Sequence, residues 1–287
     1  MPLHVAFLWH MHQPCYIDPA SGVALLPWTR LHATLNYLHM AEVLWAYPKI
    51  QAVVNLVPSL TDQLRAYARG DLTDRLLLLA TQDRWSGEEV NYLRSLCFHA
   101  PRRFIEQHPR YQELWAAPQQ GDAWGEGDTR DLLVWFHLAW TDAGWLEREE
   151  SLRRLIHKER GFSRGDLADL LNVQARMLSR VLPLYRALEE RGQVELSTSP
   201  YYHPILPLLV NTTSAHEASP GLPLPRLPLR VVKDAAEQVR RAVVQHEEHF
   251  GRPPRGLWPS EGAVSQEALA GIAGQVKWIA SDEAILA

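Results

Sequence analysis

The sequence predicts an α/β fold built on parallel strands. A short apolar run from Leu3 to Trp9 is followed by a helical segment and then a β-branched strand, which is the order of a βαβ unit. Short apolar runs return after Gly192, again with a helix between them. With 46% hydrophobic residues over 287 positions, the chain can bury the core of one large domain or two modest ones.

The first half of the chain is predicted to be mostly helical. A helix over Leu31 to Trp45 leads to a strand over Gln51 to Val57, which Pro58 ends. From about residue 60 to about residue 190, apolar residues recur at spacings of three and four, which predicts a helical insertion over one end of a sheet. A glycine-bearing stretch from Gln119 to Asp128 is predicted to be a loop within it.

Strands are predicted again in the second half. They cover Val194 to Thr198, the region near Gly256 to Trp258 and Val276 to Ala280, with a helix over Lys233 to Phe250 between the first two. The sequence reaches Ala287 a few residues after the last of them. A barrel that ended here would lack its closing strands.

Composition narrows the class of protein. The formal net charge is -4 and no long Lys/Arg cluster occurs, which argues against a nucleic-acid partner. The first ten residues lack a basic segment and no stretch reaches 18 apolar residues, so we expect no membrane association and a cytoplasmic protein. The two cysteines, Cys15 and Cys97, fit a reducing compartment and do not show metal-ligand spacing.

Polar residues follow the first predicted strand. His10 and His12 are two apart, so both point to the same face of a strand, and Gln13 follows at its carboxyl end, where α/β barrels place their chemistry. The pair could bind polyol hydroxyls, hold a metal or be satisfied in a core. A metal would need a third ligand, for which Glu195, His203 and Asp282 are scattered candidates.

Three carboxylates are placed in or after strands. Glu195 lies within an apolar strand, where a buried acid needs a partner or a ligand. Glu261 follows an apolar strand and Trp258, whose ring offers a stacking plane, so it is a candidate nucleophile. Alternatively, Glu261 is a helix N-terminal acid beside a capping Ser260. Asp282 follows the last predicted strand, and glycoside hydrolysis needs two carboxyl groups.

Other histidines are predicted to be structural. His137 lies on an apolar helical face and is interpreted as a satisfied core residue. His246 and His249 flank two glutamates and are predicted to lie on a solvated helix face.

Three motifs resemble, in order, the first three signature regions of glycoside hydrolase family 57. They are His10-Met11-His12-Gln13-Pro14, Gly192-Gln193-Val194-Glu195-Leu196 and Trp258-Pro259-Ser260-Glu261. The fuller strings from Thr198 to Pro207 and from Lys277 to Glu283 resemble the α-amylase-like branch of that family.

The resemblance implies a fold and a chemistry. The fold would be an incomplete (β/α)7 barrel, so that residues 1-287 form one catalytic domain with the helical insertion. The substrates would be α-1,4- or α-1,6-glucans, with no metal and no cofactor required. The mechanism would be a retaining double displacement with Glu261 as nucleophile. Substrate contacts would come from His10, His12, Gln13, His32, Glu195, His203, Trp258 and Asp282.

The resemblance also identifies a missing part. The acid/base Asp of the family lies in a fourth region on a later strand, and Asp282 is too early to match it. We therefore expect either a chain truncated before the last strands or a relative that has lost its general acid. In both cases, the missing acid is expected to slow turnover in isolation by about 10²- to 10⁴-fold.

Other functions stay open from the sequence. A 4-α-glucanotransferase or a branching enzyme would use the same nucleophile with another acceptor. A metal-dependent deacetylase or mannosidase-like barrel would use His10, His12 and an acid such as Asp282 as ligands. A non-catalytic glucan-binding module would fit the missing acid and the eleven Trp residues. The sequence does not predict an oligomeric state.

Overall fold

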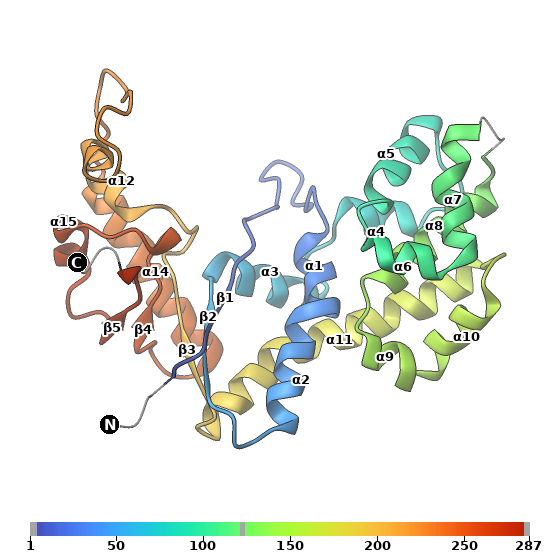
Figure 1. Cartoon of the computed structure of the whole chain (residues 1–287), viewed down its shortest axis with the longest axis horizontal. Coiled ribbons are helices and arrows are strands. Elements are labelled where there is room, and N and C mark those ends of the chain that lie inside the picture. Colours follow the sequence, from blue (N-terminus) through green and yellow to red (C-terminus); the bar gives the residue numbers. More distant parts are fainter. Residues whose placement is uncertain (1–4, 121–123, 284–287) are drawn as a thin grey trace. The chain divides into compact units, whose positions relative to one another are not determined.

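The strands of the computed structural model are short and run parallel, as the order of strands and helices in the sequence predicts (Figure 1). The structure describes residues 5–120 and 124–283. It divides into two units: unit 1 comprises the described residues of Met1–Cys15, Leu44–Gln63 and Leu182–Ala287, and unit 2 those of Tyr16–Val43 and Leu64–Val181. The strands β1 to β5 lie in unit 1, whereas unit 2 is mostly helical.

The sheet of unit 1 follows the chain order. Strands β1 (Leu8–Met11), β2 (Ala52–Leu56) and β3 (Val194–Ser197) pair side by side, and β4 (Gly256–Leu257) pairs with β5 (Trp278–Ile279). A parallel bridge between Thr198 and Leu257 joins the end of β3 to β4. Because all these neighbours are parallel, the carboxyl ends of the five strands lie at one end of the sheet.

The first strand lies later in the sequence than the apolar run predicts. Leu3 is outside the described residues, and pairing with β2 begins at Leu8. Val5 and Phe7 are 66% and 57% exposed, so their apolar character does not place them in the paired strand. As a consequence, His10 lies within β1, paired with Asn55, rather than beyond its end.

Three helices pack on the second part of the sheet. They are α12 (Leu206–Val210), α14 (Val232–Phe250) and α15 (Gln266–Ile272), and side chains from each surround the fully buried Leu257 of β4. Helix α14 ends at Gly251, which adopts the left-handed conformation that favours glycine. The alternative in which Ser260 caps the next helix is wrong, because Ser265 accepts the hydrogen bond from Ala268 N of α15.

The structure tests the histidines predicted to be structural. His137 is fully buried and its Nδ1 bonds to Leu133 O, which confirms the core interpretation. The prediction for His246 and His249 was wrong, since their side chains are buried and only the glutamates between them are exposed. His246 and His249 are three residues apart on α14, so both lie on the helix face that packs against the core. The two glutamates between them lie on the exposed face and suggested a solvated segment.

Unit 2 is an array of helices, as the three-and-four spacing predicts. Its elements, with those that continue into unit 1, are α1 (Trp28–His32), a π-helical turn (Ala33–Tyr37), α2 (Leu38–Ala46), α3 (Pro58–Arg69), α4 (Arg75–Ala80), α5 (Gly87–Cys97), α6 (Arg102–Gln107), α7 (Pro109–Gln120), α8 (Glu126–Ala139), α9 (Ala143–Arg148), α10 (Glu150–Lys158) and α11 (Arg164–Glu190). The predicted loop from 119 to 128 is shorter than expected, because α7 and α8 extend into it, and residues 121–123 lie outside the described part.

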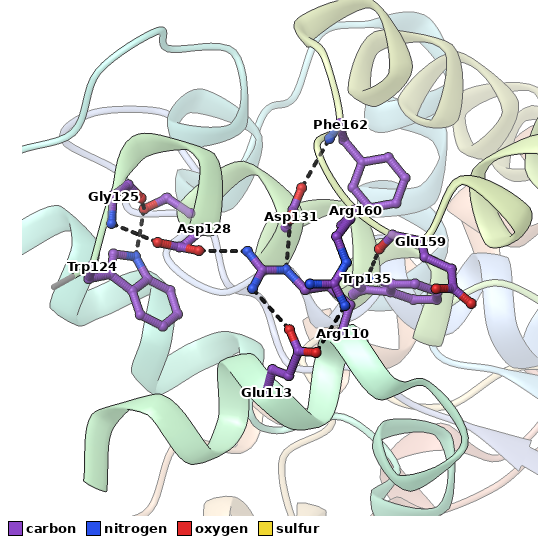
Figure 2. A network of polar contacts seen from close by, with 11 residues as sticks. Arg110, Glu113, Trp124, Gly125, Asp128, Asp131, Trp135, Glu159, Arg160 and Phe162 are labelled. Atoms are coloured by element: carbon purple, nitrogen blue, oxygen red, sulfur yellow. Dashed lines mark hydrogen bonds and ion pairs between the residues drawn. The ribbon is translucent and has the colours of Figure 1, made fainter. Parts of the chain in front are cut away.

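Arg110 connects several segments of this helical unit through a network of polar contacts (Figure 2). Its guanidinium bonds to Asp131 at 2.8 Å, Asp128 at 2.6 Å and Glu113 at 3.3 Å. Asp131 also accepts from Phe162 N at 3.0 Å, so α7, α8 and the segment before α11 are tied together. A buried carboxylate that receives several charged and neutral donors in this way repays its desolvation, which explains a structural role for these charges.

The structure also shows the state of the two cysteines and the character of the described helices. Cys15 is exposed and Cys97 is buried, and both are free thiols. Within residues 5–120 and 124–283, no helix combines the length and the apolar character needed to cross a membrane.

Candidate active site

Aromatic side chains from three strand ends meet at the carboxyl end of the sheet. The ring centroids of His12 and His203 are 4.1 Å apart, and those of His10 and His203 are 5.1 Å apart. Trp258, which directly follows β4, stacks at 5.3 Å from His10 with an interplanar angle of 20°. The sequence thus predicted a set of residues that the structure brings together in unit 1.

Asn55 fixes the orientation of His10. The side chain of Asn55 is fully buried in β2, and its Nδ2 donates to Thr198 O at 2.7 Å. Its Oδ1 therefore faces His10 Nδ1 at 2.6 Å and also accepts from the Ser199 hydroxyl at 3.0 Å. Because an amide oxygen only accepts, His10 Nδ1 carries a proton, and in the tautomer that this bond selects the lone pair lies on Nε2.

Two histidines of the cluster, His12 and His203, have pKa values that favour the neutral ring. Burial, together with the neighbouring His12 and His10, lowers the pKa of His203 to about 3. Burial and His10 also lower the pKa of His12, although Glu261 acts in the opposite direction. Neutral imidazoles each offer one donor and one acceptor, which is the combination that a sugar hydroxyl needs.

The cluster also contains an unsatisfied polar atom. The His203 side chain is 3% exposed, and its buried Nε2 has no hydrogen-bond partner within residues 5–120 and 124–283. Leaving a buried ring nitrogen unpaired costs about 1–3 kcal/mol. A ligand that reached this nitrogen would recover that cost, so the geometry favours a polar occupant.

Glu261 is presented on a left-handed turn. It lies in the short 3-10 turn Ser260–Gly262 with φ 57° and ψ 20°, a conformation that glutamate rarely adopts. The preceding Pro259 and the following Gly262, at φ 70°, shape this turn. The Glu261 side chain is 71% exposed, and its Oε1 lies 3.8 Å from His203 Nδ1. The turn therefore projects an exposed carboxylate out of the backbone beside the imidazoles.

His203 shares this unusual backbone. Its φ is also 57°, within a turn closed by a 2.8 Å bond from its own N to Pro200 O. Strained backbone of this kind costs about 1–3 kcal/mol per residue and clusters at functional sites. Two of the three non-glycine residues with positive φ in the described chain, His203 and Glu261, thus face each other in one site.

Neighbouring segments hold both turns in place. Ser281, just beyond β5, donates from its hydroxyl to Gly262 O at 2.7 Å and braces the turn of Glu261. On the other side, the Tyr201 hydroxyl donates to Asp62, and Gln238 accepts from Tyr202 N at 2.8 Å. These contacts fix the loop that carries His203 without entering the cluster themselves.

Glu195 lies at the other end of the sheet. It is the second residue of β3, level with Val53 of β2, and its Oε1 accepts from Trp278 Nε1 at 2.6 Å. Its Oε2 is 3.7 Å from Arg255. Gly256 makes this contact possible, because a Cβ there would lie 2.0 Å from the Trp278 ring. The structure therefore gives Glu195 protein partners and does not bring it to the histidines.

A pocket of about 440 Å³ occupies this amino end of the strands. Its lining includes Glu189, Glu195, Arg252 and Arg255. Burial raises the pKa of Glu189, while Leu196 N and Arg252 act against that rise. The charges of this pocket are thus largely paired with one another.

The remaining predicted residues are Gln13, Asp282 and His32. Gln13 is buried just beyond β1, and its backbone oxygen accepts from the Ser59 hydroxyl at 2.7 Å. Asp282 is exposed after β5. His32 belongs to unit 2, where its Nδ1 lies 2.8 Å from Asn36 Oδ1.

Sequence reasoning missed two residues that shape the site. Asn55 interrupts a strand of β-branched residues, and a polar amide at such a position was the signal that could have identified it. Ser281 could not be identified in this way, because serine is common in turns near strand ends whether or not it supports a site.

Solved structures provide one comparison. The chain is similar to the novel α-amylase AmyC from Thermotoga maritima, with 15% identity and a TM-score of 0.46, over 96% of this chain and 38% of that one. It is also similar to a branching enzyme from Pyrococcus horikoshii, with 17% identity and a TM-score of 0.45, over 96% of this chain and 40% of that one. A branching enzyme from Thermococcus kodakaraensis is similar as well, with 16% identity and a TM-score of 0.41, over 90% of this chain and 32% of that one. The chain therefore spans 32–40% of the length of these proteins.

The sequence itself provides the second comparison. Among proteins with curated descriptions, none matches the chain. The family model described as glycosyl hydrolase family 57 matches residues 6–284, which includes the histidine cluster and Glu261. Since this match covers nearly all of the sequence, the chain belongs to glycosyl hydrolase family 57.

Proposed function

We propose that this chain carries the nucleophile and sugar-binding side of a retaining enzyme that acts on α-glucans, with Glu261 as the nucleophile. One observation supports this proposal above the others. An exposed glutamate on a left-handed turn lies 3.8 Å from a buried, neutral histidine at the carboxyl end of parallel strands. Such an arrangement offers an unblocked carboxylate beside groups that bind hydroxyls.

In the proposed reaction, a Glu261 oxygen attacks the anomeric carbon as the bond to the leaving oxygen breaks. The new carbon–oxygen bond forms a covalent glycosyl-enzyme intermediate, and the leaving oxygen takes a proton from a general acid. By the resemblance of the motifs, that acid would be an Asp on a strand later than β5. A water molecule or a hydroxyl of a second glucan then attacks the same carbon and gives its proton back to that Asp, as the bond to Glu261 breaks and the free carboxylate is restored.

The histidines and Trp258 would hold the sugar during this attack. His10 Nε2 accepts from a sugar hydroxyl, because Asn55 occupies Nδ1. His203 and His12 supply further donors or acceptors as neutral rings. Trp258 offers a flat ring next to His10, on which the C–H face of a glucose unit can stack.

The family and the three motifs support hydrolysis and transfer alike, because the two reactions differ only in which acceptor reaches the intermediate. We propose hydrolysis, as in the α-amylase-like branch that the motifs resemble, over glucanotransfer or branching. We also propose that the five parallel strands are part of a (β/α)7 barrel, with residues 1–287 as one catalytic domain and the helical segment as its insertion.

Covalent labelling tests the proposal directly. The protein is incubated with 5-fluoro-α-glucosyl fluoride, whose activated leaving group reduces the need for an acid. Intact-mass spectrometry is expected to show one added fluoroglucosyl group, and peptide mapping is expected to place it on Glu261. An unlabelled protein that is folded by circular dichroism would contradict the proposal, and would favour a glucan-binding role without chemistry.

A further inference from the structure

Three imidazoles in the site are spaced as a metal-binding set. One ring nitrogen from each of His10, His12 and His203 lies within 4.8 Å of the others. Tetrahedral zinc with Zn–N bonds of about 2.0–2.1 Å holds its ligand nitrogens roughly 3.3–3.4 Å apart, so the rings need to close by at most about 1.5 Å. Side-chain torsions on two separate segments can supply that movement.

The cluster has a support that metal sites require. A ligating histidine almost always gives its second ring nitrogen to a fixed acceptor, which sets the tautomer. Asn55 does this for His10: it is fully buried, it is held by its bond to Thr198 O, and its Oδ1 lies 2.6 Å from His10 Nδ1. The Nε2 lone pair of His10 is therefore free of the proton that would block a metal.

His203 gives an independent sign of an absent ligand. Its side chain is 3% exposed, and the buried Nε2 has no partner among the described residues. Glu261 adds a carboxylate at 3.8 Å from the other nitrogen of the same ring, which brings negative charge to the cluster. Three nitrogen donors and a nearby carboxylate are the donor types that zinc and its neighbours in the first transition row prefer.

We propose that one divalent transition-metal ion of the zinc class binds to His10, His12 and His203 when the site holds no sugar. The ion occupies the nitrogens that would otherwise meet sugar hydroxyls, and its charge pairs with Glu261. Metal and glucan therefore exclude each other, and the metal acts as an inhibitor. This exclusion rests on the proposed function, whereas metal binding itself does not.

Cobalt provides the first test, because tetrahedral Co²⁺ absorbs visible light. The full 287-residue chain is treated with a chelator, dialysed and titrated with CoCl₂ while d–d absorption is recorded. We expect one Co²⁺ per chain and displacement of the band by Zn²⁺. His203→Ala is expected to weaken binding by at least about 100-fold and Asn55→Ala by about 10- to 100-fold, the usual effect of losing an outer partner.

His157→Ala is the matched control, because His157 is an exposed histidine of α10 outside the cluster. Its cobalt titration is expected to match that of the wild type. Absence of the band, or an unchanged titration in His203→Ala, would overturn the metal site.

The second test measures fluoroglucosyl labelling of Glu261 with and without Zn²⁺. We expect labelling to slow in proportion to metal occupancy and to recover on adding chelator. Labelling that proceeds at full rate on the metal-loaded protein would overturn the exclusion. If labelling fails without metal, the proposed glycosidase function fails, while the cobalt titration still decides the metal site.

Discussion

The two ends of the parallel sheet carry similar residues in opposite states. At the amino end, Glu195 accepts from Trp278 and lies 3.7 Å from Arg255, so an acid, an indole and a guanidinium satisfy one another. At the carboxyl end, Glu261 is 71% exposed and His203 has a buried nitrogen that meets no hydrogen-bond partner in the described part of the chain. The glutamate at one end is therefore held by protein partners, whereas the glutamate at the other end is exposed to solvent.

The backbone explains much of this difference. Glu195 lies in a regular strand, where the side chain meets neighbouring strands and Gly256 leaves room for the Trp278 ring. Glu261 lies on a left-handed turn that directs its side chain away from such neighbours. In a protein of this kind, a carboxylate in an irregular segment beyond a strand is the better candidate for catalysis than one within the strand.

The largest expected effect comes from replacing each of the two glutamates by glutamine in separate variants. Glu261→Gln removes the attacking oxygen charge, so we expect fluoroglucosyl labelling to slow by about 10³-fold or more. Glu195→Gln keeps an oxygen that accepts from Trp278, and labelling is expected to stay within about threefold of the wild type. Stopped incubations analysed by mass spectrometry give both rates. Equal losses in the two variants would remove the distinction between the ends.

The second largest effect is expected from lowering the pH, which should destabilise the protein through His203 at the carboxyl end of the sheet. The pKa of His203 is about 3 in the folded protein, against 6.5 without the fold. The unfolded chain therefore takes up the proton first, so the stability contributed by neutral His203 is present above pH 6.5 and is lost as the pH falls towards 3. Between pH 6 and pH 4, the unfolding free energy of the wild type should fall by up to about 1.4 kcal/mol per pH unit more than that of His203→Gln. Urea titrations at several pH values measure this, and parallel curves would contradict it.

A methyl group at the amino end should cost stability without changing the chemistry. In Gly256→Ala the new Cβ would lie 2.0 Å from the Trp278 ring, so we expect a loss of about 1–3 kcal/mol in unfolding free energy. Labelling per folded molecule is expected to remain. Gly127→Ala, where the Cβ meets no atom within 4 Å, is the control and should keep or raise stability. Similar losses in both variants would argue against a role for the ring.

The smallest expected effect concerns the support of the Glu261 turn. Ser281→Ala removes the hydroxyl that donates to Gly262 O, at a cost of about 1 kcal/mol, and should slow labelling by a few-fold. Ser179→Ala removes a similar bond, to Arg176 O, on α11 and should leave labelling unchanged. A labelling rate in Ser281→Ala equal to that of the control variant would show that the turn keeps its shape unaided.

Much of the sheet could be predicted from the sequence, because apolar strands and periodic helices have distinct patterns. The same logic brought His10, His12 and Trp258 to one edge, since carboxyl ends of parallel strands share a side. It could not separate Glu195 from them, because a short motif does not reveal which end of its strand a residue lies near. The burial of His246 was also hidden, since the exposed glutamates between His246 and His249 dominate the local pattern.

The finer features of the site depend on conformation and not on residue type. Left-handed backbone is predictable at glycine, but His203 and Glu261 adopt it without any local signal. Likewise, Asn55 acquires its role only when β2 lies between β1 and β3. Tertiary pairing creates that role, so a reading of β2 alone cannot supply it.

The left-handed turns have a consequence for protein engineering. Replacing Glu261 or His203 with glycine would release backbone strain of the order of 1 kcal/mol at each position while deleting the groups that we propose to meet the sugar. Selection of random variants for heat resistance alone should therefore enrich glycine and asparagine at these two positions. Such enrichment would indicate that natural selection has kept these two strained residues for their function at the cost of stability.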